Sequence, residues 1–236
     1  MQLKSYIGRP ARPEYTAAAM LIVCDFDGTI TTHDCLNLIV QRFAPQAWAT
    51  IEPRLRAGEI TLLDAIVEEF RHVKVTEEEA VDCVLQGAQI RAGFPEFVEW
   101  AEDSGYDIVV VSAGFEVLIT PMLAAAGLSR LPVYSGDATF TREGTEIAYP
   151  STTRECASCC GMCKKDVVEE LAHKTTSPKP LVHIGDGLSD LCVAREADLV
   201  FARGSLARLL DKEGIPYRPF EDFFEVRRVL ESSFPR

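Results

Sequence analysis

Two aspartates lie one residue apart where a short apolar run of the sequence ends. In the segment LIVCDFDGTI (21–30), Asp25 and Asp27 flank Phe26. Two carboxylates this close resist ionising together unless a cation or a transferable proton lies between them. The pair therefore predicts a site that holds a metal ion, moves a proton, or does both.

Polar and small residues also follow two later apolar runs, DIVVVSAG (107–114) and PLVHIGDG (180–187). The residues at the ends of these runs are Ser112, Ala113, Gly114, Asp186 and, four positions further on, Asp190. In open α/β sheets, ligands bind in the crevice outside the carboxyl ends of the strands. We therefore expect these residues to meet Asp25 and Asp27 at one rim of a sheet.

Such a rim has the chemistry of phosphoryl transfer. Several carboxylates together favour a hard divalent cation, and Mg²⁺ takes oxygen ligands that include one or two carboxylates. The Ser112 hydroxyl and the N–H groups of Ala113 and Gly114, at the expected start of a helix, would bind an anion. Lys164 or Lys165 would add positive charge. A metal, a lysine and backbone donors around a carboxylate are the groups that phosphoryl transfer requires.

Strand and helix patterns alternate along the chain. Short apolar runs at 20–24, 107–114, 180–187 and 197–203 are separated by segments whose apolar residues recur at three- and four-residue spacing. This alternation predicts βαβ units and an α/β fold, with a Rossmann-like three-layer core whose parallel sheet is covered on both faces. Residues 131–150 predict a strand and a small hairpin.

The chain divides into three predicted parts. Residues 1–19 have the composition of a loosely held N-terminal arm. Residues 35–92 have a mostly helical pattern and no strand of their own, which predicts an inserted helical cap. Residues 20–34 and 93–236 would then form the core.

The composition is that of a globular protein with an acidic surface. The chain has 236 residues, of which 47% are hydrophobic and 25% charged, and its net charge of −12 disfavours nucleic acid as a partner. Since no apolar run approaches the roughly 20 residues of a membrane helix, we expect no membrane partner. The N-terminus lacks a secretory pattern, so we expect a cytoplasmic location. The oligomeric state is left open.

Eight cysteines fall into two groups. The scattered ones are expected to be reduced core thiols: Cys24, Cys35, Cys83 and Cys192. The clustered ones are Cys156, Cys159, Cys160 and Cys163. This cluster allows a structural Zn²⁺ site, a redox-sensitive disulfide, or a buried turn in which cysteine serves as a small apolar residue. The adjacent pair of cysteines is awkward for one tetrahedral ion.

Four motifs together resemble the signature of the haloacid dehalogenase superfamily phosphatases. They are DFDGT, a serine with small residues after an apolar run, a lysine, and GDGLSD, in this order over nearly the whole chain after residue 19. The resemblance implies a hydrolase of phosphoric monoesters in which Asp25 is the nucleophile and forms an aspartyl-phosphate. It implies that Asp27 is the general acid and base, and that Asp186 binds Mg²⁺ with Asp25 and the backbone carbonyl of Asp27.

The same resemblance assigns roles to the surrounding residues. Thr29 and Ser112, with the backbone of Ala113 and Gly114, would bind phosphate oxygens. Lys164, directly after the last clustered cysteine, would neutralise charge in the transition state. Asp190 would be a supporting carboxylate that orients the metal or the lysine. His183, inside the strand predicted from the 180–187 run, is expected to be a core histidine with satisfied polar atoms.

The substrate would be a small phosphorylated metabolite, and several subfamilies remain open. IRAGFPEFVEW, CGMCK and IPYRPFEDF resemble the 2-hydroxy-3-keto-5-methylthiopentenyl-1-phosphate phosphatases of methionine salvage, and related phosphoethanolamine/phosphocholine phosphatases also place MCK after cysteines. Phosphoserine phosphatases use a cap arginine to hold the substrate carboxylate, where this chain has Val67, Glu68 and Glu69. Asp34 is the nearest match to the acidic residue that binds their substrate's amino group. An alternative from another class, a non-catalytic metal or redox sensor using the 156–163 loop, predicts the loss of a motif, and none is lost.

Overall fold

The computed structural model describes residues 20–150, 161–173 and 180–234. The strands are β1 (Leu21–Cys24), β2 (Asp107–Phe115), β3 (Val133–Phe140), β4 (Thr145–Ala148), β5 (Leu181–Gly185), β6 (Leu199–Ala202) and β7 (Arg218–Pro219). The helices are α1 (Cys35–Phe43), α2 (Pro45–Arg56), α3 (Leu62–Phe70), α4 (Glu77–Gly87), α5 (Phe94–Asp103), α6 (Glu116–Ala125), α7 (Lys164–His173), α8 (Leu191–Ala194), α9 (Gly204–Glu213) and α10 (Phe223–Ser233). The short turns η1 (Phe26–Ile30) and η2 (Leu188–Asp190) follow β1 and β5.

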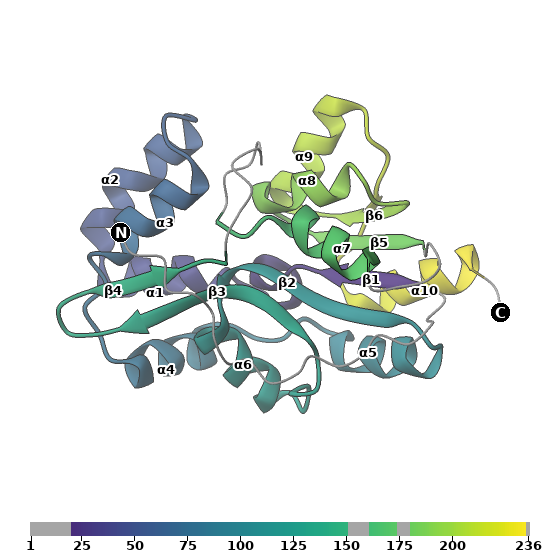
Figure 1. Cartoon of the computed structure of the whole chain (residues 1–236), viewed down its shortest axis with the longest axis horizontal. Coiled ribbons are helices and arrows are strands. Elements are labelled where there is room, and N and C mark those ends of the chain that lie inside the picture. Colours follow the sequence, from purple (N-terminus) through teal and green to yellow (C-terminus); the bar gives the residue numbers. More distant parts are fainter. Residues whose placement is uncertain (1–19, 151–160, 174–179, 235–236) are drawn as a thin grey trace.

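The strands form one sheet in the order β4-β3-β2-β1-β5-β6-β7 (Figure 1). Neighbouring strands are parallel except for the antiparallel hairpin of β3 and β4. In the centre of the sheet, Cys24 of β1 is paired with Val110 of β2 and with Ile184 of β5. This register brings the carboxyl ends of three strands to the same edge. The predicted α/β fold with a parallel sheet is confirmed, and so is the hairpin.

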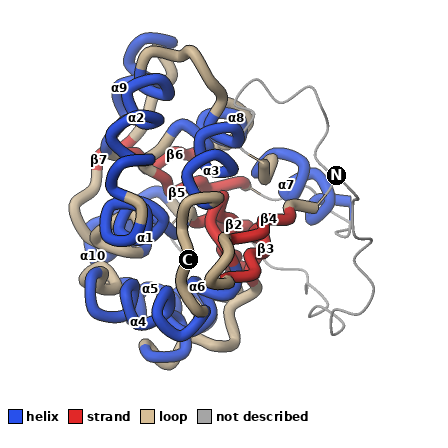
Figure 2. The backbone as a smooth tube through the Cα atoms, turned by 90° about the vertical axis from the view of Figure 1, so that its left-hand side faces the viewer, coloured by secondary structure: helices blue, strands red, loops and turns tan. Residues whose placement is uncertain are grey.

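Both faces of the sheet are covered by helices. Ile22 and Cys24 point to the face that packs against α5, α6 and α10, whereas Leu21 and Val23 pack with α7 and α8. Figures 1 and 2 show these two helical layers on either side of the strands, with α9 extending the second layer. Burial on both faces is the reason that the strands read as continuous apolar runs.

Residues 35–92 are helical, as their pattern predicts, but they contain one helix more than the three segments with helical apolar spacing indicate. These segments are LNLIVQRFA, ITLLDAIVEEF and EEEAVDCVLQGAQI. The additional helix is α2, which has Pro53 inside it and buries only Ile51. In Figure 1, α2 and α3 extend away from the sheet, whereas α4 lies beside α6. The boundaries 35–92 of a separate cap stay a prediction, because buried residues of this segment share one hydrophobic cluster with β1.

In the parts of the chain that the structure describes, none of the helices combines the length and the apolar character needed to cross a membrane. The predicted N-terminal arm, 1–19, lies outside the described residues.

Candidate active site

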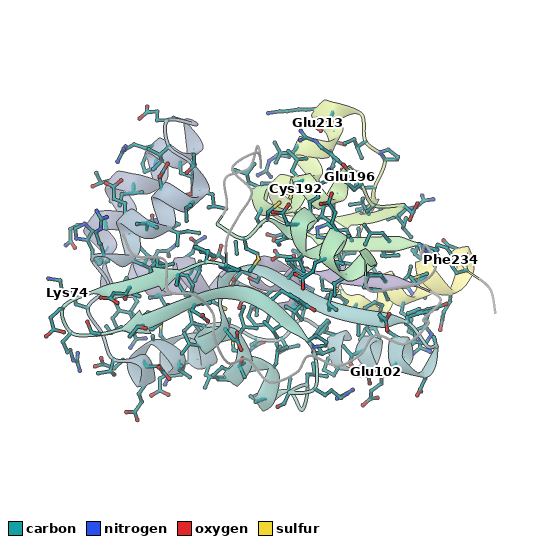
Figure 3. The ribbon with its side chains drawn as sticks, viewed as in Figure 1. Lys74, Glu102, Cys192, Glu196, Glu213 and Phe234 are labelled. Carbon is teal, nitrogen blue, oxygen red and sulfur yellow. The ribbon has the colours of Figure 1, made fainter. Side chains whose placement is uncertain are left out.

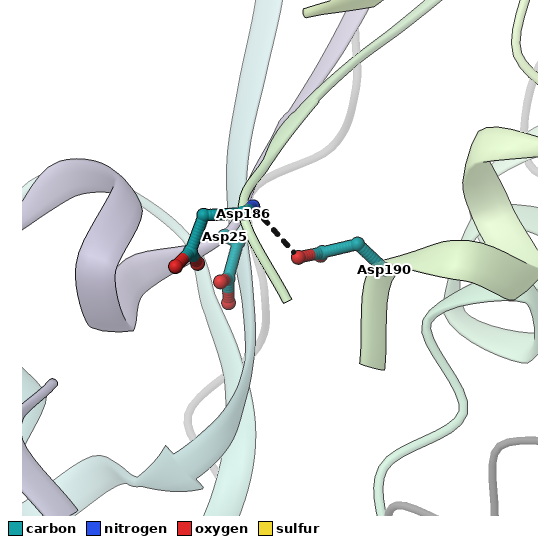
Figure 4. Close-up of side chains that lie close together, drawn as sticks. All are labelled: Asp25, Asp186 and Asp190. Atoms are coloured by element: carbon teal, nitrogen blue, oxygen red, sulfur yellow. Dashed lines mark hydrogen bonds between the residues drawn. The ribbon is translucent and has the colours of Figure 1, made fainter. Parts of the chain in front are cut away.

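The ends of the three central strands bring the predicted residues together. Asp25 follows β1, Ser112 lies near the end of β2, and Asp186 follows β5 directly. Asp25, Asp186 and Asp190 surround one point, with one oxygen of each within 4.8 Å of the others (Figure 4). The predicted meeting of carboxylates at one rim of the sheet therefore occurs.

Lys164, and not Lys165, lies among these carboxylates. Its fully buried ammonium group is 2.5 Å from Asp25 Oδ1 and 2.6 Å from Asp190 Oδ1. Burial opposes its charge, but the two carboxylates outweigh burial and raise the pKa of Lys164. Lys165 is partly exposed and pairs at 2.9 Å with Glu196, which is labelled in Figure 3.

The carboxylate of Asp190 is fixed by protein donors on both oxygens. Its Oδ1 accepts a hydrogen bond from Lys164, and its Oδ2 accepts the backbone N–H groups of Asp186 at 3.0 Å and Gly187 at 2.9 Å. Burial opposes its ionisation, but Lys164 and His183 lower the pKa of Asp190 below its usual range. This arrangement fits a residue that orients the lysine and the loop after β5.

His183 is not the satisfied core histidine that we expected from the sequence. It is fully buried, its Nε2 lies 3.1 Å from Asp190 Oδ1, and its Nδ1 has no partner among the described residues. Gly185 makes room for this contact, because a Cβ at that position would lie 2.8 Å from His183 Nε2. The sequence signal that could have been used is the strand alternation that puts His183 and Gly185 on one face of β5.

Asp27 lies in a setting suited to holding a proton. Its Oδ1 accepts the backbone N–H of Cys35 at 2.9 Å, and its Oδ2 is 3.5 Å from Ser112 Oγ. Burial and the neighbouring charge of Asp25 raise the pKa of Asp27 to about 6. Gly114 gives this carboxyl its space, since a Cβ there would lie 2.5 Å from Asp27 Oδ2.

The predicted phosphate-binding residues are present at the rim, with two differences from expectation. Gly114 belongs to β2 rather than to a helix start, and its N–H donates to Ser112 Oγ at 2.9 Å. The hydroxyl of Thr29 donates to Asp186 Oδ1 at 3.2 Å and lies 3.5 Å from Asp25 Oδ2. Thr29 is thus placed to orient the two carboxylates in this structure.

The donor set fits a hard divalent cation. Burial and the charge of Asp190 raise the pKa of Asp25 well above its usual value, and the same two causes raise the pKa of Asp186 to about 7. The single positive charge of Lys164 therefore does not balance the negative charge of these carboxylates. A divalent cation would balance it, and carboxylate oxygens are ligands that suit Mg²⁺. Gly28 (φ +74°) allows the close approach, since a Cβ there would lie 2.5 Å from Asp186 Oδ2.

The predicted zinc site cannot be assembled from the described residues. Cys163 is buried directly before Lys164, whereas the other three clustered cysteines, Cys156, Cys159 and Cys160, lie outside the described part of the chain. A role for this loop stays a prediction.

Comparison with known proteins agrees with this arrangement. Residues 20–210 match the family described as "Putative Phosphatase". The chain belongs to this family. The phosphatase is 31% identical over 218 residues to 2-hydroxy-3-keto-5-methylthiopentenyl-1-phosphate phosphatase of Brevibacillus brevis, covering 90% of this chain and 95% of that protein. It is 34% identical over 216 residues to the "Bifunctional enzyme MtnB/MtnX" of Bacillus licheniformis, covering 90% of this chain but only 49% of that longer protein.

Solved structures show the same fold. The phosphatase matches the structure named "Phospho-Aspartyl Intermediate Analogue of Phosphoserine phosphatase" with a TM-score of 0.69 at 17% identity, covering 90% of this chain and 99% of that one. It matches a substrate-bound phosphoserine phosphatase complex with a TM-score of 0.67, also at 17% identity, covering 89% of this chain and 97% of that one. The resemblance to haloacid dehalogenase superfamily phosphatases, and to the methionine-salvage subfamily, is confirmed, as is the prediction of an enzyme.

The phosphatase has a cavity of about 650 Å³ over the carboxyl ends of the central strands. Its lining residues come from α2 and α3 on one side and from η2 and α9 on the other. Figure 1 shows where these helices lie above the sheet. The end of the cavity at the sheet is lined by Asp25, Asp27, Ser112, Ala113, Gly114 and Asp186. The helical side contributes Leu55, Leu62 and Ile66, together with the acidic residues Asp34, Glu52 and Glu69.

Sequence reasoning missed Arg91, which holds the turn that follows the first aspartate. The buried guanidinium group of Arg91 donates to the carbonyl oxygens of Gly28 at 2.6 Å, Thr29 at 2.7 Å and Thr31 at 2.9 Å. These carbonyls belong to the segment that positions Asp25 and Asp27. In the sequence, Arg91 stands out only as a charged residue among apolar and small ones, in IRAGF, and this does not indicate which groups it contacts.

Replacing Arg91 with methionine should destabilise this phosphatase, because three buried carbonyls would lose their charged donor. We expect the free energy of unfolding, measured by urea denaturation, to fall by about 3 kcal/mol. The matched control is Arg195→Met, because among the described residues Arg195 forms its ion pair with Glu213 at the surface. Its free energy of unfolding should stay within about 1 kcal/mol of wild type. Equal losses in the two variants would contradict a special role for Arg91.

Proposed function

We propose that this phosphatase hydrolyses 2-hydroxy-3-keto-5-methylthiopentenyl-1-phosphate with Mg²⁺ as its cofactor. The observation that carries the proposal is the alignment with the Brevibacillus brevis enzyme of that name over 95% of its length. The cavity supports it, since its apolar wall of Leu55, Leu62 and Ile66 suits an uncharged thioether tail.

In the first step, a carboxylate oxygen of Asp25 attacks the phosphorus atom. The P–O bond to the leaving group breaks as the new bond between Asp25 and phosphorus forms. Asp27 gives its proton to the departing oxygen, which leaves as a hydroxyl group. The pKa of about 6 for Asp27 keeps this proton transferable near neutral pH. The products of the step are an aspartyl-phosphate on Asp25 and an ionised Asp27.

In the second step, the ionised Asp27 takes a proton from water, and the oxygen of that water attacks phosphorus. The bond between Asp25 and phosphorus breaks, inorganic phosphate is released, and both carboxyl groups return to their starting states. The unlike roles of the two aspartates explain how they share one site: one stays ionised against positive charge while the other carries a proton.

The remaining residues stabilise charge and hold geometry. Lys164 faces Asp25 and would balance negative charge on the transferring phosphoryl group. Ser112 lies between Asp27 and Gly114, where its hydroxyl can bind a phosphate oxygen. Mg²⁺ held by Asp25, Asp186 and the carbonyl of Asp27 would supply Lewis-acid stabilisation of the phosphoryl oxygens.

A panel of small phosphomonoesters tests the proposal. With Mg²⁺, we expect kcat/KM for the methylthiopentenyl phosphate to exceed those for phosphoserine, phosphoethanolamine and pyridoxal phosphate by at least about tenfold. Removal of divalent ions with EDTA should abolish phosphate release, and added Mg²⁺ should restore it. Equal rates on all esters would contradict the substrate, and full activity without a metal would contradict the cofactor.

A further inference from the structure

Three carboxyl groups line the helical side of the active-site cavity. Asp34 precedes α1, Glu52 lies on α2, and Glu69 lies on α3. The two arginines that also line the cavity are Arg56, whose side chain is 72% exposed, and the exposed Arg208 of α9. The buried side of this part of the cavity is therefore acidic.

Two of these carboxyl groups have partners from the chain itself. Asp34 caps α1 and accepts the backbone N–H of Asn37 at 2.8 Å. Glu52 accepts a hydrogen bond from Arg56 at 2.6 Å, one helical turn further along α2. Both carboxyl groups are therefore committed to local structure.

Glu69 differs from both. It is only 6% exposed, and its Oε1 has no hydrogen-bond partner within the described ranges. Burial and the charges of Glu52 and Asp34 raise the pKa of Glu69 to about 7. A buried polar atom without a partner is costly unless something else supplies one, and Glu69 is among the residues that line the cavity.

The preceding residue gives the contrast. Glu68 lies on the outer side of α3, its side chain is 42% exposed, and Arg54 pairs with it at 3.1 Å. It does not line the cavity. The rotation of α3 therefore places Glu68 at the surface and Glu69 at the cavity.

We propose that Glu69 is a specificity-determining residue: its carboxyl group hydrogen-bonds a hydroxyl group of an uncharged leaving group and rejects phosphomonoesters whose leaving group carries a carboxylate. The inference rests on the proposed function, whose substrate has by its name a hydroxyl, a keto and a thioether group. Like charges in a buried cavity repel strongly, so an ionised Glu69, with Glu52 and Asp34 beside it, would exclude a substrate carboxylate.

The test compares wild type with Glu69→Gln, which removes the charge, and with Glu69→Asp, which keeps the charge but withdraws it by one methylene group. Glu68→Gln is the matched control on the same helix. For each enzyme, kcat/KM is measured on the methylthiopentenyl phosphate and on phosphoserine, and each value is divided by that enzyme's own value on p-nitrophenyl phosphate. The ratio removes any general loss of activity.

In Glu69→Gln, the ratio for the methylthiopentenyl phosphate should fall about tenfold, and the ratio for phosphoserine should rise at least about threefold. Glu69→Asp should lower the first ratio severalfold while phosphoserine stays rejected. Glu68→Gln should give wild-type ratios for both substrates. A wild-type ratio for the methylthiopentenyl phosphate in either Glu69 variant would overturn the inference, and so would an unchanged phosphoserine ratio in Glu69→Gln. If Glu69→Gln fails to fold, the first ratio of Glu69→Asp provides the test alone.

The two proposals fail in different ways. If wild type does not prefer the methylthiopentenyl phosphate, the proposed substrate is wrong, and the phosphoserine ratio of Glu69→Gln still tests the rejection of carboxylates. If wild type prefers that substrate but Glu69→Gln and Glu68→Gln behave alike, the proposed function holds and the role of Glu69 is wrong.

Discussion

Replacing Asp25 with asparagine should lower turnover by roughly four orders of magnitude or more while the fold stays intact. An amide of the same shape cannot act as the carboxylate nucleophile that accepts the phosphoryl group. The fold should survive because the change removes one negative charge from a buried cluster that already holds Asp186 and Asp190. Phosphate release at saturating substrate measures the first effect, and thermal unfolding measures the second.

The control for this variant is Asp103→Asn, at an exposed position near the end of α5. It removes the same charge from the chain far from the cavity and should have wild-type turnover. Hydrolysis by Asp25→Asn at the wild-type rate would contradict the assignment of Asp25 as the nucleophile, for any substrate.

Replacing Lys164 with methionine should have the second largest effect, on activity and on stability together. The change removes the ammonium group that contacts both Asp25 and Asp190. Without its charge, we expect kcat to fall by about 10²- to 10³-fold. The free energy of unfolding should fall by about 3 kcal/mol, because breaking a buried ion pair leaves its carboxylates uncompensated.

Lys165→Met is the matched control for this prediction. Lys165 is the adjacent residue and has the same side chain. Within the described ranges, its ion pairs are with the surface carboxylates Glu196 and Glu169. We expect its stability to stay within about 1 kcal/mol of wild type and its kcat to be unchanged. Similar losses of activity in the two variants would contradict the placement of Lys164 as the lysine of the active site.

The sequence is sufficient to predict the core of the fold because its strands are buried on both faces. The runs that become β1, β2 and β5 are continuous and apolar, and each is followed by residues with functional side chains. Parallel pairing then brings these strand ends to one edge. For that reason Asp25, Asp27, Ser112 and Asp186 could be expected to meet before their contacts were known.

Other features depend on contacts between distant parts of the chain and could not be read from local patterns. Arg91 reaches back 63 positions to the carbonyl of Gly28, and no spacing in the sequence encodes that contact. The contact between His183 and Asp190 forms only when the loop after β5 folds over that strand, so the sequence shows His183 only as one residue of an apolar run. Helix α2 has an internal proline and a narrow buried face, so its apolar periodicity is weak.

Tertiary packing also decides which of two adjacent glutamates faces the cavity. Glu68 and Glu69 are adjacent and chemically the same, and a sequence pattern does not say which one faces the cavity. The packing of α3 against α2 fixes the rotation of the helix and turns Glu69 inward. Our proposals therefore assign substrate specificity to the helical segment and the chemistry to the strand ends.

The most direct test of the mechanism is chemical trapping of the phosphorylated enzyme. The phosphatase is mixed with substrate and Mg²⁺, quenched rapidly in acid, and treated with borohydride, which reduces an aspartyl-phosphate to homoserine. Mass spectrometry of the peptides should then show homoserine at Asp25 and no change at Asp27. Reduction at another carboxyl group, or none during active turnover, would contradict the central role of Asp25.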